Sequence, residues 1–262
     1  WRYETKDREI MERVLDGAIG RVTSGRVTYL TGGLWARPRQ EGDTELMAQV
    51  RNWYNHTWLS GDFDVEQHVH TLDHIAWAMG GAMPATCYGL GSRMQRVAQP
   101  ESGDIYDSMS AVFEYPNGET FYSFCRQQNG CWNENAAYIF GTKGRAKTLW
   151  GGGAIYDLSG NVIFQQEGGI SDMYTLEHEA LYKSIRGEID TINNGESMAK
   201  STMLGIWQRE TCYTGEKTTW DAALNSDKSY APSEYAENGV PQNVPDENGR
   251  LKIQVPGLGS VY

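Results

Sequence analysis

The clearest pattern of apolar and polar positions lies between Ser60 and Gly80. Apolar residues recur there at i, i+4, i+7, i+11 and i+14, which is the spacing of one stripe along an α-helix. We therefore predict a helix that packs with this stripe, is capped at its start by Asp62 or Asp64, and ends at Gly80 and Gly81. The stripe consists of Val65, Val69, Leu72, Ala76 and Met79.

A second stripe on the same helix carries reactive side chains. At about 100° per residue, Glu66, His70 and Asp73 fall with Trp77 within roughly 60° of one another. Because Glu66 precedes His70 by four residues, its carboxylate is expected to accept one ring N–H and to fix the tautomer, so that the imidazole serves as acid or base. The same spacing also suits an ordinary surface pair on an amphipathic helix.

An extended backbone would give this segment a different chemistry. With a period of two, Glu66, His68 and His70 would share one face, and two histidines with one carboxylate suit a metal ion. The apolar spacing favours the helix, in which His68 points roughly 160° away from His70. We therefore predict no metal site and expect His68 in the core or at an interface. His74 lies about 40° from His70 and either lines the same pocket or faces solvent.

The region before this helix contains further candidates for substrate binding. A short helix is expected within residues 1–17, a strand at 21–29, and a short helical piece near 45–53. The rest of residues 32–58 has no clear period, and its Arg, Trp and Tyr residues are typical of a functional loop, although a loop that only packs on its own domain fits equally well. The expected substrate contacts are Arg37, Arg39, Trp53, Tyr54, Gln67, Asp73, His74 and Trp77.

The region after the helix alternates strand and turn signals. Strands are expected at residues 85–95, 105–115, 119–127, 135–141, 144–150, 154–158 and 161–165, followed by helices at 174–187 and 196–212. Consecutive strands with short connections predict an α+β fold with an open, mostly antiparallel sheet and helices packed on one face. We expect one domain over residues 1–225 and an extended tail over 226–262, where Asn, Pro, Gly and Ser are frequent.

Composition narrows the possible functions. The net charge is −11 and there is no basic stretch, which argues against non-specific nucleic-acid binding. The sequence has no run of about 18 apolar residues, so we predict no membrane span. The nine Trp and fifteen Tyr residues are typical either of a large core and interface or of a site where sugar rings stack. No G-x-G-x-x-G turn, P-loop or G-x-S-x-G motif occurs, so the chain has no recognisable nucleotide site.

Several local motifs resemble the second, α/β domain of the glucose–fructose oxidoreductase / inositol dehydrogenase / MocA (Gfo/Idh/MocA) family. The resemblance covers about residues 1–225. A longer insert at residues 37–61 is similar to a bacterial subgroup whose members are often exported, so a periplasmic location is expected if the protein is exported and a cytoplasmic one otherwise. The motifs are Glu66-x-x-x-His70-x-x-Asp73 with Trp77 and Gly80, Gly141-Thr142-Lys143-Gly144, Tyr213-Thr214-Gly215 before Trp220-Asp221, and Asp16-Gly17-Ala18-Ile19-Gly20.

The resemblance implies a sugar dehydrogenase. In that family an N-terminal Rossmann domain binds NAD(P), a lysine of that domain helps to bind the substrate hydroxyl, and the sheet of the second domain mediates oligomerisation. The second domain supplies an Asp four residues before a His. In this sequence those positions are Glu66 and His70, so Glu replaces the usual Asp. Neither the Rossmann domain nor its lysine is in this sequence.

Two functional hypotheses follow. In the first, the intact protein is an NAD- or NADP-dependent oxidoreductase that acts on a hydroxyl of a sugar, glycoside or polyol, with His70 and Glu66 as catalytic residues. The cofactor is then bound by a domain absent from this chain, and the sheet forms a homodimer or homotetramer. In the second, the chain has no redox activity and is a binding or assembly module, or a carbohydrate lyase or hydrolase that uses the Glu66–His70 pair.

Overall fold

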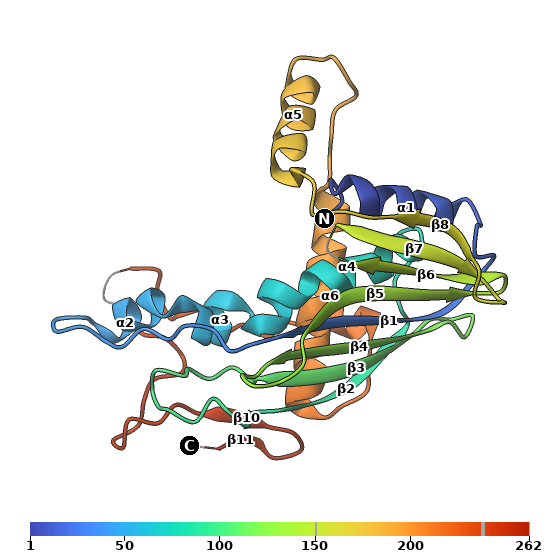
Figure 1. Cartoon of the computed structure of the whole chain (residues 1–262). Helices are drawn as coiled ribbons and strands as arrows, with labels where there is room; N and C mark the ends of the chain where they lie inside the picture. Colours follow the sequence, from blue (N-terminus) through green and yellow to red (C-terminus); the bar gives the residue numbers. More distant parts are fainter. Residues whose placement is uncertain (150, 237–238, 262) are drawn as a thin grey trace.

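A nine-stranded sheet with helices on one face forms the body of the molecule (Figure 1). The computed structural model describes residues 1–149, 151–236 and 239–261. Residue 150, at the end of one predicted strand, and residues 237–238 and 262, in the predicted tail, lie outside the described residues. The α+β class and the open, mostly antiparallel sheet predicted from the sequence are confirmed.

The strand order is β8-β7-β6-β5-β1-β4-β3-β2-β9. All neighbours pair antiparallel except β1 and β4, which run parallel with Ser24 opposite Thr120. The strands are β1 (Val22–Thr31), β2 (Thr86–Ser92), β3 (Ser108–Glu114), β4 (Thr120–Gln127), β5 (Glu134–Gly141), β6 (Gly144–Leu149), β7 (Gly152–Asp157), β8 (Val162–Gln166) and β9 (Thr218–Thr219).

Helices from both ends of the chain cover the inner face of the sheet. Helix α1 packs on β6 and β7, α4 on β1 and β5, and α6 on β2 and β3. The helices are α1 (Thr5–Leu15), α2 (Glu45–Arg51), α3 (Thr57–Ser60), α4 (Val69–Ala78), α5 (Met173–Ile185), α6 (Gly195–Thr214) and α7 (Trp220–Leu224), with a 3₁₀ turn at Trp53–Asn55 and a π-helical turn at Asp64–His68.

The core forms where the alternating strands meet these helices. Buried and less buried residues alternate along β3 and β4, as expected for a sheet with one covered face. The covered positions bring Phe113 and Phe121 against Trp207 of α6 and Leu72 and Ile75 of α4, all at most 1% exposed. Burial of these large side chains outweighs the entropy lost in ordering them.

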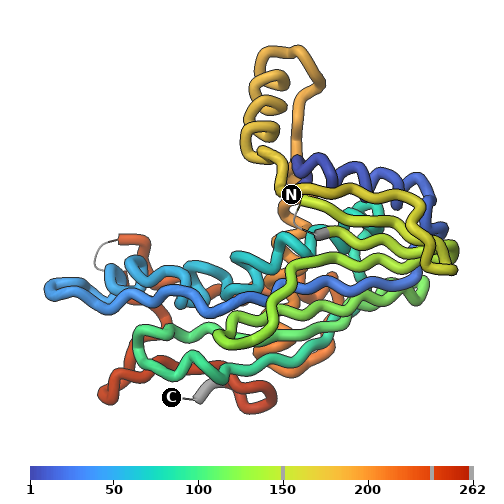
Figure 2. Tube along the Cα trace, viewed as in Figure 1, coloured from blue at the N-terminus to red at the C-terminus, as the bar shows by residue number. Residues whose placement is uncertain are grey.

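Two apolar surfaces remain outside this core. The uncovered face of the sheet exposes Tyr88, Leu90, Tyr122, Phe124 and Phe140, each 38–71% accessible. Helix α5 stands away from the sheet in both views of the chain (Figures 1 and 2) and exposes most of its side chains.

The C-terminal tail lies beside the connection between β2 and β3 (Figures 1 and 2). It contains a small hairpin, β10 (Ile253–Val255) and β11 (Gly259–Val261). Leu251 is fully buried, and the Tyr106 hydroxyl donates to the Gln254 carbonyl. The tail is therefore packed on the domain along this connection.

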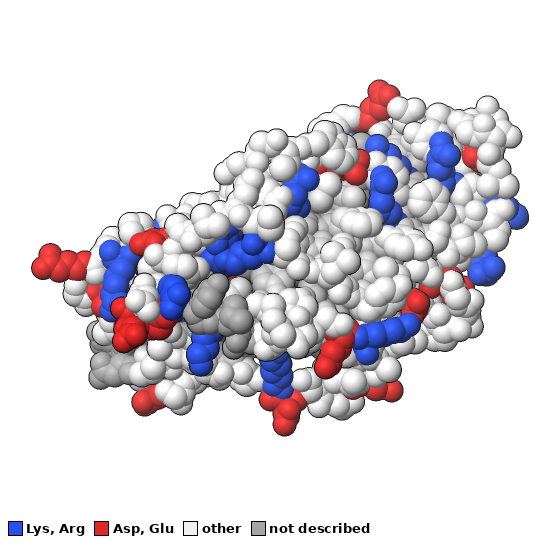
Figure 3. Space-filling model, turned by 90° about the horizontal axis from the view of Figure 1, so that it is seen from below, with Lys and Arg blue, Asp and Glu red and all other residues white. Residues whose placement is uncertain are grey.

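The surface in Figure 3 carries interspersed positive and negative side chains separated by uncharged atoms, without a continuous basic band. Among the described residues, no helix combines the length and apolarity that a membrane crossing requires.

Candidate active site

The predicted helix of residues 60–80 forms as a π-helical turn from Asp64 to His68 followed directly by α4. The short helix α3 precedes it and ends at Ser60, with Gly61 as its C-cap. The chain can turn between α3 and the π-helical turn because Gly61 and Asp62 have positive φ angles of 76° and 73°. The predicted end is confirmed, since Gly80 and Gly81 have positive φ and their N–H groups bond to the carbonyls of Trp77 and Ala76.

The predicted cap by Asp62 or Asp64 is wrong. The π-helical turn and α4 have no side-chain cap at their first residue. Both carboxyl groups are fully buried instead, and Asp62 accepts hydrogen bonds from Tyr106 N–H and the Tyr213 hydroxyl. Burial outweighs these bonds and raises the pKa of Asp62 to about 6. These aspartates anchor the segment to the core instead of ending a helix.

His68 lies in the core, as expected from the helical interpretation. Its Nε2 is 2.6 Å from Ser123 Oγ and its Nδ1 is 2.8 Å from Thr71 Oγ1. Because Thr71 also donates to the His68 carbonyl, Nδ1 carries the proton and Nε2 accepts from Ser123. Desolvation lowers the pKa of His68 to about 3, which keeps the ring neutral. The extended two-histidine metal arrangement is therefore not formed.

His70 lies in the first turn of α4 with an exposed side chain. It lines a cleft of about 520 Å³ between the chain start, α4 and α6. Asp73 and Trp77 line the same cleft, so three members of the predicted stripe lie together. Desolvation lowers the pKa of His70, and the negative charge of Asp73 acts in the opposite direction. A neutral imidazole at neutral pH can accept a proton from a bound hydroxyl.

Glu66 is half-buried, and no hydrogen bond joins it to His70. The π-helical turn explains the difference from the sequence prediction. Its i→i+5 pattern adds a residue to the turn, which shifts Glu66 away from the i,i+4 alignment with His70. Burial raises the pKa of Glu66. Desolvation, followed by the charge of Glu66, raises the pKa of the nearby Tyr29 to about 12.

Asp73 is held by two residues, Arg2 and Ser201, whose contacts with it were not predicted from the sequence. Arg2 Nε and Nη2 donate to its two oxygens at 2.8 and 2.9 Å, and Ser201 Oγ of α6 donates at 2.6 Å. Desolvation opposes ionisation, but these bonds and the Arg2 charge lower the pKa of Asp73. The Arg2 guanidinium also lies over the Trp77 ring, with its carbon 4.9 Å from the ring centre. The cleft thus has a fixed carboxylate beside the mostly buried ring of Trp77.

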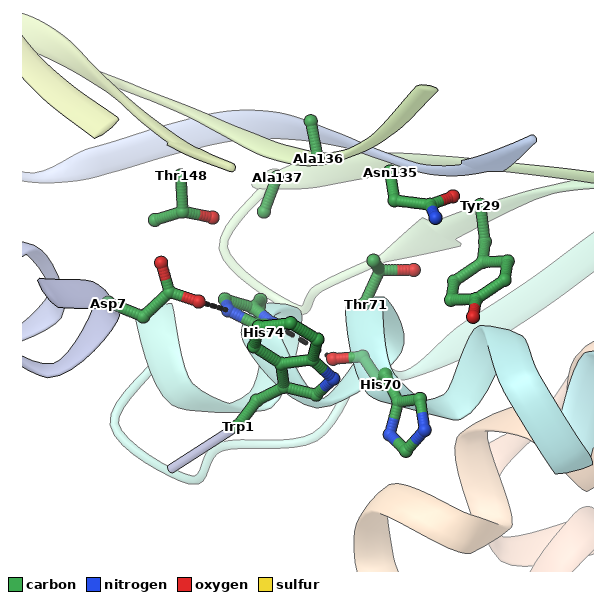
Figure 4. Close-up of a pocket in the computed structure, with 10 residues that line it drawn as sticks. All are labelled: Trp1, Asp7, Tyr29, His70, Thr71, His74, Asn135, Ala136, Ala137 and Thr148. Atoms are coloured by element: carbon green, nitrogen blue, oxygen red, sulfur yellow. Dashed lines mark hydrogen bonds and ion pairs between the residues drawn. The ribbon is translucent and has the colours of Figure 1, made fainter. Parts of the chain in front are cut away.

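His74 points away from this cleft toward α1 (Figure 4). Its Nε2 is 3.4 Å from Asp7 Oδ2 and its Nδ1 is 2.9 Å from the His70 carbonyl. Because both partners are acceptors, both ring nitrogens must donate, which requires the imidazolium form. Desolvation works against this charge, but Asp7 raises the pKa of His74. A small cavity of about 20 Å³, drawn in Figure 4, is lined by this pair and by His70.

The loop candidates form a separate group. Trp35, Trp53 and Tyr54 pack edge to face, and the Arg37 guanidinium lies 4.8 Å from the Trp35 ring centre. Gln127 of β4 connects this group to the segment before α4, since its Nε2 donates to both Tyr54 Oη and Gln67 Oε1 at 2.7 Å.

Arg39 is bound within its own loop. It pairs with Glu45 at 2.9 Å and donates to the Asp43 carbonyl. Neither Arg37 nor Arg39 lines the cleft that contains His70. The arginines of the loop therefore reinforce the loop and its aromatic group.

A buried polar cluster lies on the core side of the π-helical turn. Asp64, His68 and Cys125 each offer a potential metal-ligand atom, and these atoms lie within 4.8 Å of one another. The Cys125 thiol and the Gln208 amide already donate to Asp64 Oδ1. Burial raises the pKa of Asp64 well above its usual value, so we interpret the cluster as a neutral hydrogen-bond network.

Comparison with known proteins places this geometry in a family. The GFO/IDH/MocA C-terminal domain model matches residues 8–147, which is more than half of the chain. The chain belongs to the Gfo/Idh/MocA family. A search of curated proteins found no match.

Solved structures share the fold of this Gfo/Idh/MocA chain. An aldose–aldose oxidoreductase from Caulobacter crescentus, complexed with glycerol, has a TM-score of 0.64 and 18% identity over 83% of this chain and 61% of its own. A levoglucosan dehydrogenase, complexed with NADH and levoglucosan, has a TM-score of 0.61 and 17% identity over 83% and 64%. An oxidoreductase from Thermotoga maritima has a TM-score of 0.63 and 16% identity over 85% and 61%. The chain spans less than two thirds of the length of each.

Sequence reasoning missed most of the cleft wall of this Gfo/Idh/MocA domain. Trp1, Arg2 and the hydroxyls of Ser197, Ser201 and Thr202 line the cleft with His70. The spacing of Ser197 and Ser201 by one helical turn was a signal in the sequence, because such residues share a helix face. No pattern in the sequence predicted that Arg2 would bind Asp73, which lies 71 positions away.

Proposed function

We propose that this chain is the substrate-binding and catalytic domain of an NAD(P)-dependent oxidoreductase that acts on a hydroxyl of a sugar, glycoside or polyol. The observation that carries the proposal is the exposed imidazole of His70 in a cleft with the fixed carboxylate of Asp73 and the ring of Trp77. Carboxylates and hydroxyls bind sugar hydroxyls, and an aromatic ring packs on the apolar face of a sugar.

His70 would take the proton in this reaction. Oxidation of a CH–OH group to C=O releases one proton from oxygen and one hydride from carbon, and NAD(P) supplies the hydride acceptor when it is bound. The lowered pKa of His70 leaves the ring free to accept the hydroxyl proton at neutral pH, and the same group returns it in the reverse direction. Asp73 would bind a neighbouring hydroxyl and orient the sugar.

Glu66 enters the proposal as a positioning residue. Its carboxylate would have to reach the imidazole in the substrate complex, because the two groups do not bond in the free chain. Tyr54 and Gln67 would act at the edge of the site through their shared partner Gln127, and Trp53 and Arg37 would support Tyr54 within the aromatic group of the loop. Arg39 and His74 would support their loop and helix.

The cofactor would be bound by a separate domain. Across the part of the chain that the structure describes, no glycine-rich turn joins a parallel strand to a helix, so these residues do not form a Rossmann site. The intact mass of the source protein tests this point. A mass larger than 29.4 kDa by a domain of about 100–200 residues supports the proposal. A mass near 29.4 kDa favours the second hypothesis, a binding module or a lyase or hydrolase that uses Glu66 and His70.

Steady-state kinetics of the intact protein test the role of His70. His70→Ala should reduce kcat by at least about a hundredfold, with an unchanged circular-dichroism spectrum. Asp73→Asn should act mainly on KM, because its expected role is binding. His178→Ala, at an exposed histidine on α5, is the matched control and should leave both constants unchanged. Unchanged turnover in His70→Ala would refute the catalytic assignment.

We further propose that the uncovered sheet face forms a homodimer or homotetramer. Monomeric proteins seldom leave a continuous apolar patch of this kind in water. Tyr122 and Phe124 lie near the middle of this face on β4 and are 45% and 39% exposed. Sedimentation should show an oligomer for the parent chain and a monomer for Tyr122→Lys. A monomeric parent would contradict this interface.

A further inference from the structure

A second cleft, lined by arginines, lies beside the end of β2. It measures about 410 Å³ and is bounded by the connection after β2 and by the C-terminal tail. Arg93 and Arg96 come from the connection, and Leu251, Ile253 and Gln254 from the tail. Figures 1 and 2 show these two segments side by side at the lower edge of the sheet. The two clefts share no lining residue.

Arg96 is buried (9% exposed) and Arg93 half-buried, and neither forms an ion pair among the described residues. Within the described ranges, no carboxylate oxygen lies within 4.0 Å of either guanidinium, whereas thirteen other ion pairs occur. A buried cation without a counter-charge is costly, so a native structure normally supplies one.

Each guanidinium also has an unused donor. Arg93 Nη1 donates to the Ile105 carbonyl, but its Nη2 is buried without an acceptor. Arg96 uses Nη1 for Asn55 Oδ1 and Nη2 for Gln127, and its Nε is likewise buried without an acceptor. The acceptors that the two guanidinium groups do bond are all neutral, so one nitrogen of each and the positive charge remain for a ligand.

Neighbouring carboxylates reduce the positive potential but are already bonded. Asp107 Oδ2 accepts three backbone N–H groups, from residues 94 to 96, which fixes the connection around the arginines. Asp104 accepts from Thr57 and from Asn243 of the tail. Desolvation, and then repulsion between the two guanidinium groups, lower the pKa of Arg93, while the charges of Asp104 and of the buried Asp62 act in the opposite direction.

We propose that this cleft binds a small organic anion, a sugar-sized molecule with one carboxylate or phosphate group, held by Arg93 and Arg96. The volume exceeds what an inorganic ion needs, and Val97 and Ile253 provide apolar wall for a carbon skeleton. Arg93 Nη2 and Arg96 Nε each offer an N–H donor to an oxygen of either anion. The tail would close over the ligand, since the tail supplies one wall.

Calorimetric titration of the chain with D-glucuronate and with glucose 6-phosphate tests the proposal. At constant ionic strength, we expect saturable binding of at least one of them, with D-glucose, the neutral match, at least tenfold weaker. Binding of glucuronate alone identifies a carboxylate ligand, and binding of the phosphate ester alone identifies a phosphate ligand. Absence of saturable binding for both anions, or equal binding of glucose, overturns the proposal.

Variants locate the ligand. Arg93→Met should weaken anion binding at least tenfold, whereas Arg186→Met, at an exposed arginine after α5, should leave it unchanged. Binding that is lost in Arg2→Met but kept in Arg93→Met belongs to the His70 cleft and overturns the proposal. If Arg93→Met does not fold, titration of the parent chain labelled with ¹⁵N-arginine gives the answer: the Arg96 Nε–H resonance must shift on saturation, and an unshifted resonance contradicts the proposal.

Discussion

The buried pair of Asp7 and His74 offers the sharpest test of the structure, because His74 also donates to the His70 carbonyl in the first turn of α4. The change is Asp7→Asn, which keeps the shape of the side chain and removes its charge. Two unit charges 3.4 Å apart attract by about 5 kcal/mol at an effective dielectric constant of about 20. The desolvation of both groups offsets part of this attraction. Removing one partner of a buried pair costs about 3–5 kcal/mol of stability.

The variant should therefore be destabilised in a pH-dependent way. In the parent chain, Asp7 raises the pKa of His74 above its unfolded value of about 6.5, so the pair stabilises the fold fully below that pH and loses its effect as the pH rises through the folded pKa. In Asp7→Asn, a neutral His74 can still donate through Nδ1 to the His70 carbonyl and accept from the new amide. We expect a loss of about 3 kcal/mol near pH 5.5 that falls below about 1 kcal/mol near pH 9.

Urea unfolding, followed by tryptophan fluorescence at several pH values, measures this difference. His178→Gln is the matched control, because His178 also contacts the carbonyl four residues earlier, through Nδ1 at 2.7 Å, but on an exposed helix. It should change the free energy of unfolding by less than about 1 kcal/mol at every pH. A difference between Asp7→Asn and the parent that stays constant or grows with pH would show that His74 is not the charged partner.

Three further changes address other parts of the fold. Gly103→Ala should lower the free energy of unfolding by at least about 3 kcal/mol, because a Cβ at this position, where φ is +60°, would lie 1.5 Å from the Asn55 carbonyl oxygen. A denaturation midpoint equal to the parent's would contradict this close approach. Ser123→Ala should cost about 1–3 kcal/mol because it leaves Nε2 of buried His68 without a partner, and Ser123→Thr should restore much of this loss if the hydroxyl is what matters. Asp172→Ala should lower the amide-exchange protection factors in the first turn of α5 several-fold. Acidification that protonates Asp172, whose pKa the cap holds below its usual value, should do the same in the parent; protection factors insensitive to both changes would exclude the cap.

Much of the architecture could be predicted from residue order alone. The strand signals between residues 85 and 165 and their short turns predicted the antiparallel sheet, because alternation and turn residues act over a few positions. The stop at Gly80 and Gly81 was equally local, since positive φ there needs only glycine. The stripe of His70, Asp73 and Trp77 followed from helical spacing, and the structure places all three on one cleft.

Only the tertiary structure decided how distant segments meet. The insertion of β1 between β5 and β4 pairs residues about a hundred positions apart, for which spacing carries no information. The hydrogen bonds from Arg2 to Asp73 and from Tyr213 to Asp62 also join residues that are distant in the sequence. Because of the second bond, Asp62 is buried in the core and does not cap a helix. The π-helical turn between Asp64 and His68 had the largest effect on the site. Packing of His68 and Asp64 into the core holds this turn, and it removes Glu66 from the alignment that a regular helix would have given.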